Sequence, residues 1–149
     1  MERVKVVILN WNGRAYLERF LPSVVERTPG VPVVVADNGS TDDSVAFLRA
    51  RFPQVEVIAL ERNYGFAEGY NRALERIEAE YFLLLNSDIE VPEGWLSPLV
   101  EALDADGRTA AVAPKILSFD RPDRFEYAGA AGGFIDFLGY PFCRGRILS

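Results

Sequence analysis

The sequence predicts an α/β fold in which a mostly parallel, Rossmann-like sheet carries helices on both faces. Short apolar runs alternate with longer stretches of helical periodicity between residues 4 and 113. Repeats of this kind place their strands parallel, because each helix returns the chain to the same end of the sheet. Polar clusters directly follow several apolar runs, as expected at the edge of such a sheet where ligands bind.

Each element is predicted from its own local pattern. Strands are expected at residues 4–9, 31–36, 55–60, 81–85 and 110–113, and helices at residues 14–27, 42–51, 66–77 and 92–103. Pro22 predicts a kink or a break in the first helix, and Pro92 marks the start of the fourth. Ser40 or Thr41 is expected to cap the second helix. The apolar run at residues 81–85 has no polar break, which predicts burial on both faces.

The last part of the chain has a different composition. Between residues 118 and 149, glycine and proline recur among Phe and Tyr, and no helical pattern is present. These features favour short strands or loops over a second domain. We therefore expect one domain over residues 1–149, with an α/β core at 1–117 and an irregular or short-strand extension at 118–149.

Charge and composition exclude several classes of function. The 149 residues carry a net charge of −6 and a pI near 4.7, which argues against nucleic-acid partners because these need clustered Lys and Arg. Histidine is absent and Cys143 is the single cysteine, so an internal disulfide and a Cys/His zinc site are both excluded. A reduced cytoplasmic setting fits this cysteine usage. No signal peptide or membrane span is visible, and peripheral contact with the inner face of a membrane stays open.

Three polar clusters follow predicted strands and occupy residues 10–13, 37–42 and 86–88. A parallel sheet brings such clusters into one crevice, although each alone is also typical of a turn. Asp37 could accept hydrogen bonds from a ribose hydroxyl or a base N–H, or it could cap the helix that follows. Asp88 and Asn86 offer oxygen ligands for Mg²⁺ or Mn²⁺ beside a diphosphate, or they only begin a turn.

A fourth cluster, at residues 63–71, contains Gly65, Gly69 and Asn71. The two glycines permit close approach of a ligand or of another backbone segment. Asn71 would lie a little over one turn into the third helix. The alternative interpretation is a loop followed by an ordinary helix.

Taken together, the four clusters resemble the family 2 glycosyltransferases with the GT-A fold, and most closely their rhamnosyltransferase-like branch. The matching segments keep the family's order and spacing and read VVILNWN at 6–12, VVADNGSTD at 34–42, NYGFAEGYN at 63–71 and LLNSD at 84–88. In that branch an Asn or similar residue, here Asn86, replaces the first Asp of an Asp-x-Asp motif. The segment at residues 113–116 also resembles that branch, so the likeness extends from residue 4 to about residue 117.

This resemblance implies a nucleotide-sugar pocket. The segment from Asn10 to Asn12, together with Asp37, would hold the base and the ribose. Asp88, helped by Asn86, would bind a divalent Mg²⁺ or Mn²⁺ that bridges the diphosphate. The Gly65 loop and Asn71 would line the donor pocket. The donor-binding residues expected on this basis are Asn10, Trp11, Asn12, Asp37, Asn38, Gly65, Asn71 and Ser87.

The same resemblance implies transfer of a sugar from a UDP-, dTDP- or GDP-sugar to a hydroxyl of a glycan or lipid-linked acceptor, in polysaccharide or cell-envelope glycan synthesis. Such a transfer needs a base within reach of the hydroxyl, but no family motif surrounds the late carboxylates Asp120, Asp123, Glu126 and Asp136. The catalytic residue is therefore unknown, and we expect the donor-binding portion of a longer enzyme or a truncated product. Apolar side chains of the tail would then be poorly covered and drive self-association into a homo-oligomer, or else complete the small core: Phe134, Phe137, Leu138, Tyr140 and Phe142.

Three other functions share parts of the pattern. A non-catalytic nucleotide-binding module would have the same pocket without turnover. A phosphoacceptor signalling domain could use Lys115, but it needs acidic residues where positions 10–12 and 60–62 read Asn-Trp-Asn and Leu-Glu-Arg. A dehydrogenase would need a G-x-G-x-x-G turn after the first strand, and this turn is missing.

Overall fold

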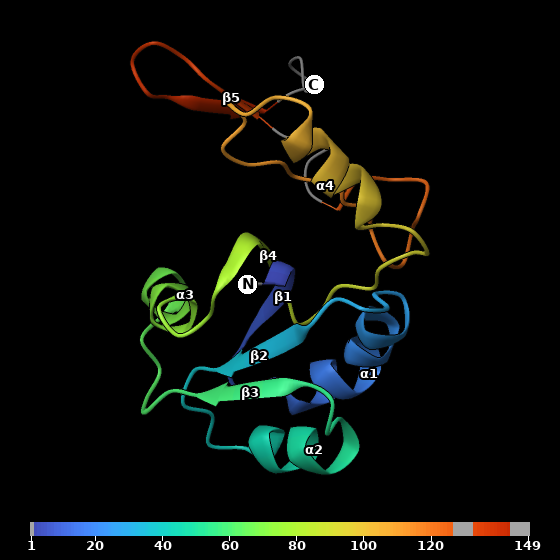
Figure 1. Ribbon diagram of the computed structural model, residues 1–149, viewed down its shortest axis with the longest axis vertical. Helices are drawn as coiled ribbons and strands as arrows, with labels where there is room; N and C mark the ends of the chain where they lie inside the picture. Colours follow the sequence, from blue (N-terminus) through green and yellow to red (C-terminus); the bar gives the residue numbers. More distant parts are fainter. Residues whose placement is uncertain (1, 127–132, 144–149) are drawn as a thin grey trace. The chain divides into compact units, whose positions relative to one another are not determined.

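The computed structural model describes residues 2–126 and 133–143, which belong to two compact units, residues 1–94 and 95–149. The first unit contains β1 (Glu2–Asn10), α1 (Arg14–Glu26), β2 (Val33–Asp37), α2 (Ser44–Arg51), β3 (Glu56–Ala59), α3 (Phe66–Leu74) and β4 (Ala79–Asn86) (Figure 1). The second unit contains α4 (Ser97–Asp104), β5 (Gly133–Ile135) and β6 (Pro141–Cys143). In the described ranges, no helix combines the length and the apolar character needed to cross a bilayer.

The strands of the first unit form one parallel sheet in the order β3-β2-β1-β4. Val7 in β1 is paired with Val34 in β2 on one side and with Leu84 in β4 on the other. The chain therefore adds β2 and β3 on one side of β1 and then crosses over to add β4 on the other. The carboxyl end of β1 lies at this switch point, where ligands bind in doubly wound sheets. The predicted mostly parallel α/β sheet is confirmed.

Side chains of the sheet alternate between two buried faces, as the two-residue repeat of a strand requires. Val7, Val34 and Ile58 pack with Tyr70 and Ile77, so α3 covers one face. The alternate side chains of β1 and β2 are also buried, and right-handed crossovers place α1 and α2 over them (Figure 1). The prediction of helices on both faces is therefore confirmed.

The strand β4 is covered less completely than its composition predicts. Its burial alternates along the strand, with Leu83 and Leu85 partly buried, Phe82 39% exposed and Leu84 51% exposed. β4 is one of the two edge strands of this sheet, and the core that includes α3 is built on β1, β2 and β3. The predicted burial on both faces is wrong, because an apolar run does not reveal whether its strand lies at the centre or at the edge of a sheet.

The helix limits differ in part from those predicted. The first helix is found at Arg14–Glu26 and continues through Pro22, because the buried stripe that contains Leu17 and Val24 favours continuation over the loss of one hydrogen bond. A break at Pro22 is therefore excluded, and a kink there stays a prediction. The second helix begins at Ser44 and not at residue 42, and its N-cap is Asp43 rather than Ser40 or Thr41. The fourth helix begins at Ser97, where a proline of the first turn, not Pro92, takes the favourable position.

The strand predicted at residues 110–113 is absent, and this part of the chain is an extended loop. The segment is dominated by alanine, which has a low preference for strands. The second unit instead forms an antiparallel hairpin in which Gly133 is paired with Cys143 and Ile135 with Pro141.

At the tip of this hairpin, Asp136 Oδ1 accepts hydrogen bonds from the amides of Leu138 and Tyr140, both at 2.9 Å. Phe137 is 95% exposed at this tip, and Leu138 and Tyr140 are also exposed. The side chains of Phe134 and Phe142, which the tail prediction also named, lie outside what the structure describes. The prediction of self-association therefore stays a prediction.

Tyr70 joins the two strands that meet at the switch point. Its side chain is buried, and its hydroxyl accepts a hydrogen bond from the Leu9 amide at 3.4 Å and donates one to the Leu85 carbonyl at 3.0 Å. Burial raises the pKa of the Tyr70 hydroxyl, so this group stays protonated and able to donate. The hydroxyl thus satisfies a backbone group of β1 and one of β4 from the face that α3 covers.

Tyr70→Phe is expected to lower the free energy of unfolding by about 1–2 kcal/mol, because it leaves these two backbone groups without their partner. Urea denaturation monitored by circular dichroism would measure the change. Tyr16→Phe is the matched control, since Tyr16 is 54% exposed on α1 and its hydroxyl is open to water. Equal effects of the two substitutions would show that the Tyr70 hydroxyl contributes nothing to stability.

Candidate functional site

Strand register brings three of the four polar clusters to one edge of the sheet. Asn10 at the end of β1 is paired with Asp37 at the end of β2, and Leu9 is paired with Asn86 at the end of β4. The residues that follow these strands therefore start from neighbouring positions. The candidate site is built on this carboxyl edge, with β1 in the middle.

The base of the site is a buried polar unit, Asn10 and Asp37, joined to the partly buried Ser40. Asn10 is 0% exposed and Asp37 is 2% exposed. Asn10 Nδ2 donates to Asp37 Oδ2 at 2.9 Å and to Ser40 Oγ at 3.2 Å, while the Ser40 amide donates to Asp37 Oδ1 at 2.9 Å. Asn10 Oδ1 is buried without a hydrogen-bond partner among the described residues, so it remains an open acceptor.

Asn12 links the loop after β1 to the loop after β2 by hydrogen bonds. Its Oδ1 accepts hydrogen bonds from the amides of Thr41 at 2.7 Å and Asp42 at 3.3 Å, and its own amide donates to Ser40 Oγ at 2.8 Å. Asn12 adopts a φ of 50°, a conformation that Asn tolerates better than most residues. Beside this junction, Trp11 is 57% exposed and presents its ring to solvent.

Asp42 continues this junction toward the start of α1. Its Oδ2 accepts a hydrogen bond from the Arg14 amide at 3.2 Å, and its Oδ1 accepts one from the Ser44 amide at 3.0 Å. Desolvation alone would raise the pKa of the Asp42 carboxyl, but the hydrogen bonds from Ser44 and Arg14 outweigh it and lower the pKa. Asp42 therefore stays a carboxylate and holds the loop after β2 against the start of α1.

Asn38 has its polar atoms engaged within the protein. Its Nδ2 donates to Asn63 Oδ1 at 3.0 Å and to the Gly65 carbonyl at 2.9 Å, and its Oδ1 accepts from the Tyr64 amide at 3.0 Å. Asn38 is 2% exposed, and a Cβ on Gly69 would come within 2.9 Å of its Nδ2. Asn38 therefore positions the Gly65 loop, and its amide has little capacity left for a ligand.

The third cluster combines exposed and partly buried side chains. Asn86 and Asp88 are exposed, and Ser87 is partly buried. A Cβ on Gly13 would lie 2.4 Å from Asn10 Oδ1 and 3.6 Å from Ser87 Oγ, which places Ser87 beside the turn that follows β1. Within the described ranges, the Asp88 carboxylate forms no hydrogen bond or ion pair, so its oxygens are available to a ligand.

Like Trp11 and Asp88, Asn71 forms no described side-chain hydrogen bond or ion pair with another predicted site residue. It lies on α3 and is exposed, whereas its helix neighbours Tyr70 and Ala73 face the sheet. Ser40, by contrast, was predicted only as a helix cap, although it hydrogen bonds to both Asn10 and Asn12. Its amide, three residues after Asp37, donates to Asp37 Oδ1 as in a side-chain cap, and this spacing is the sequence signal for its place beside Asp37.

The oxygen donors at this edge fit a divalent cation that takes most of its ligands from elsewhere. Across residues 2–126 and 133–143, no group of three or more His, Cys, Asp or Glu side chains could enclose a metal ion. Asp88 supplies one free carboxylate, and Asn86 supplies an exposed amide oxygen. Mg²⁺ is characteristically held by one or two carboxylates together with phosphate oxygens and water, which matches this sparse donor set.

Comparisons with known proteins give the family and the fold. The sequence profile described as Glycosyl transferase family 2 matches residues 5–144. The N-acetylglucosaminyl-diphospho-decaprenol L-rhamnosyltransferase of Mycobacterium tuberculosis is 28% identical over 137 residues, which cover 84% of this chain and 44% of that protein. The chain spans between 21% and 44% of the length of the curated relatives that it matches.

Two solved structures share the fold. S. aureus TarS 1–349 in complex with UDP-GlcNAc has a TM-score of 0.61 and 21% identity, over 78% of this chain and 38% of that one. The mannosyltransferase PcManGT from Pyrobaculum calidifontis, in complex with GDP-Man and Mn²⁺, has a TM-score of 0.60 and 23% identity, over 76% of this chain and 33% of that one. These likenesses establish that the chain has the GT-A fold.

Proposed function

Because this chain belongs to glycosyltransferase family 2, we propose that its carboxyl edge binds a nucleoside-diphosphate sugar and that the protein transfers the sugar to an acceptor hydroxyl. The proposal depends on one observation: a buried polar unit and a free carboxylate lie on the same edge of the sheet. Asn10 and Asp37 form the unit at the ends of β1 and β2, and Asp88 follows β4. A nucleotide sugar has the same division, with a base and ribose at one end and a diphosphate at the other.

The buried unit would bind the base and the ribose. Each Asp37 oxygen accepts one hydrogen bond within the protein, and a carboxylate oxygen can accept a second from a base N–H or a ribose hydroxyl. The exposed indole of Trp11 offers a flat face on which a base can stack. Gly65, in the loop that Asn38 holds, adopts a φ of 80° and leaves space where a side chain would stand.

Asp88 would bind the cation, with Asn86 as a second oxygen donor. A bound Mg²⁺ or Mn²⁺ would offset the charge of the diphosphate and stabilise it as a leaving group. Ser87 lies beside the turn after β1 and could donate its hydroxyl to a phosphate oxygen. The structures named above support this division, since one is in complex with UDP-GlcNAc and the other with GDP-Man and Mn²⁺.

The acceptor and the setting are part of the same proposal. We propose a glycan or lipid-linked acceptor, used in the cytoplasm at the inner face of a membrane. The similarity to a relative whose name specifies an N-acetylglucosaminyl-diphospho-decaprenol substrate supports a lipid-linked acceptor. The proposal gives no described carboxylate the role of the catalytic base, which an inverting transfer needs beside the acceptor hydroxyl.

Asp88→Asn tests the cation site. Isothermal titration of UDP, dTDP and GDP, with and without Mn²⁺, should show tighter binding of one nucleotide with Mn²⁺ for the unchanged protein. The substitution should weaken Mn²⁺ binding at least roughly tenfold, because even the outer partners of metal ligands contribute that much. The midpoint of thermal unfolding should stay unchanged, since Asp88 holds no described contact.

Asp120→Asn is the matched control, because Asp120 is another exposed carboxylate outside the first unit. Equal Mn²⁺ dependence in the unchanged protein and Asp88→Asn would refute the assigned role. An assay of donor-sugar hydrolysis then separates an enzyme from a binding module. Nucleotide binding without hydrolysis or transfer would favour the module.

A further inference from the structure

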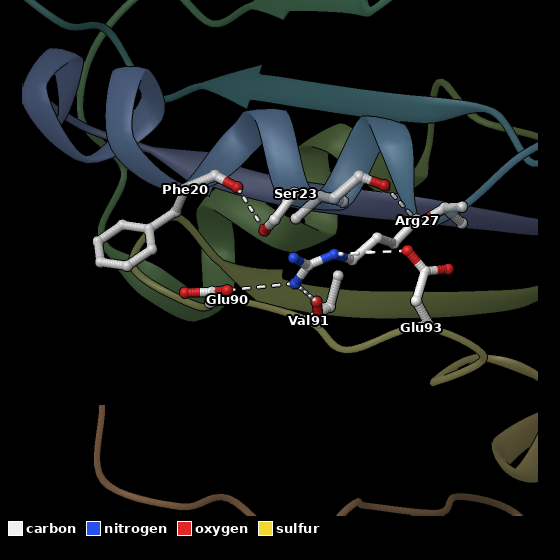
Figure 2. Close-up of polar contacts among 8 residues, drawn as sticks. Phe20, Ser23, Arg27, Glu90, Val91 and Glu93 are labelled. Carbon is white, nitrogen blue, oxygen red and sulfur yellow. Dashed lines mark hydrogen bonds and ion pairs between the residues drawn. The ribbon is translucent and has the colours of Figure 1, made fainter. Parts of the chain in front are cut away.

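Arg27 connects the end of α1 to the segment that follows β4 and Asp88. Figure 2 shows its guanidinium between Glu90, Val91 and Glu93. Nη1 donates to Glu90 Oε1 at 3.2 Å and to the Val91 carbonyl, and Nε lies 3.7 Å from Glu93 Oε1. One side chain thus holds a backbone carbonyl and two carboxylates of a segment more than sixty positions away in the sequence.

The backbone at Arg27 is held in place by α1. Arg27 caps α1, and its amide donates to the Ser23 carbonyl at 3.0 Å, so its backbone is fixed where the helix ends. At the other end, Val91 is 3% exposed and belongs to the core. The planar guanidinium can direct N–H groups to several acceptors at once, which a lysine ammonium on a flexible stem does less well.

Asp88 lies between two anchored points of the chain. Before it, Asn86 ends β4 and is paired with Leu9 of β1. After it, Glu90 and Val91 are held by Arg27. Because the Asp88 carboxylate forms no hydrogen bond or ion pair with a described residue, its position depends on these two anchors and on the short turn between them.

Arg27 also makes the carboxylates of this segment differ in their partners. Glu90 and Glu93 lie within ion-pair distance of the guanidinium, whereas Asp88 pairs with no described residue. A cation that approaches this edge therefore meets one free carboxylate near the end of β4 and two carboxylates that share the single positive charge of Arg27.

We infer that Arg27 is a positioning residue for the divalent cation: by holding Glu90 and Val91 it fixes the turn that presents Asp88. The inference rests on the proposed function, because it assumes that Asp88 binds the cation. Fixing the turn lowers the conformational entropy lost when the cation binds, in the way that partners behind metal ligands do elsewhere. Loss of the guanidinium should therefore weaken metal binding more than nucleotide binding.

Arg27→Met tests the inference, since methionine keeps the apolar stem and removes every donor. Mn²⁺ binding in the presence of UDP or GDP, followed by calorimetry and by the Mn²⁺ electron paramagnetic resonance signal, should weaken about tenfold. Nucleotide affinity without metal should change less than about twofold, because Arg27 contacts neither the buried unit nor Trp11. Arg49→Met is the matched control, as Arg49 is exposed on α2, and it should leave Mn²⁺ affinity unchanged.

Two milder variants cover the case in which Arg27→Met does not fold. Arg27→Lys keeps the positive charge but loses the planar guanidinium with its several N–H donors. Glu90→Gln leaves the contact of Arg27 with the Val91 carbonyl in place and removes one ion pair. Each variant should weaken Mn²⁺ binding severalfold, which is less than the effect of Arg27→Met. Unchanged Mn²⁺ affinity in both variants would overturn the inference.

The outcomes separate this inference from the function on which it rests. If Asp88→Asn and the unchanged protein bind Mn²⁺ equally, the proposed cation site is wrong and the inference falls with it. If Asp88→Asn loses Mn²⁺ while folded Arg27→Met keeps it, the inference alone is wrong. If Arg27→Met weakens Mn²⁺ binding and metal-free nucleotide binding by the same factor, Arg27 only supports the fold and the inference is again overturned.

Discussion

Gly39→Ala is expected to lower the free energy of unfolding by about 2–5 kcal/mol, which is a large part of the stability of a small domain. Gly39 has a φ of 71°, a conformation that costs a residue with a Cβ about 1–2 kcal/mol. The added Cβ would also lie 2.4 Å from both Cα and C of Arg62. These are backbone atoms that no rotamer change can move, so overpacking adds about 1–3 kcal/mol.

Gly30→Ala separates the two contributions. Gly30 has a similar φ of 75°, but no atom lies within 4 Å of the Cβ that alanine would add. It should therefore cost only the conformational part, about 1–2 kcal/mol. Urea denaturation of both variants would measure the difference, and equal losses would show that the backbone at Arg62 shifts aside at no cost.

The close approach at Gly39 also matters for the site. It lets the loop after β2 lie against residues 62–63, and from there Asn38 holds the Gly65 loop. Any Gly39→Ala protein that still folds should bind nucleotide more weakly, because the two loops can no longer meet in the same way.

The sequence predicts the sheet well where local pattern and global position agree. β1 and β2 are apolar runs that lie at the centre of the sheet, and the strands predicted there are present with most of their side chains buried. β4 has an equally apolar run but lies at the edge, and Phe82 and Leu84 are exposed there. Whether a strand has neighbours on both sides is decided by the whole chain, and the composition of one strand does not carry that information.

The same limit applies to the site. The position of polar clusters after strands predicts which residues share an edge, because parallel strands end together. It does not predict which of them bind one another. Asn38 and Asn12 were predicted to bind the donor, but their amide oxygens accept backbone hydrogen bonds from neighbouring loops. The contact of Arg27 with Glu90 joins residues with no local pattern in common, so the sequence gives no sign of it.

These contacts divide the site into parts with different tasks. Buried polar side chains such as Asn10 and Asp37 hold the loops together and also offer acceptors to the donor, whereas exposed ones such as Trp11 and Asp88 form no hydrogen bond or ion pair with a described residue and are left to contact a ligand. Substitutions in the first group should therefore change stability and binding together, whereas those in the second should change binding alone.

Asp37→Asn is expected to reduce stability by about 2–3 kcal/mol, although the two side chains have nearly the same shape. Asp37 Oδ2 accepts from Asn10 Nδ2, and Oδ1 accepts from the Ser40 amide. An amide at position 37 must place its NH₂ group against one of these donors. If the Asn10 amide turns to offer Oδ1 instead, its own Nδ2 loses both acceptors, so a buried donor is left unpaired in either case. Loss of the carboxylate should also weaken nucleotide binding at least about tenfold, as a hydrogen bond to a charged group is worth about 1.5–3 kcal/mol.

Exchanging the two residues separates stability from binding. In the double variant Asn10→Asp with Asp37→Asn, the amide at position 37 can donate to the carboxylate at position 10 and still accept from the Ser40 amide. Most of the lost stability should return, and urea denaturation of both single variants and the double variant would measure this coupling. Nucleotide affinity should remain low, because the carboxylate now stands at the end of β1 instead of β2. Recovery of both stability and affinity would show that Asp37 only holds Asn10 and Ser40 in place and does not contact the donor.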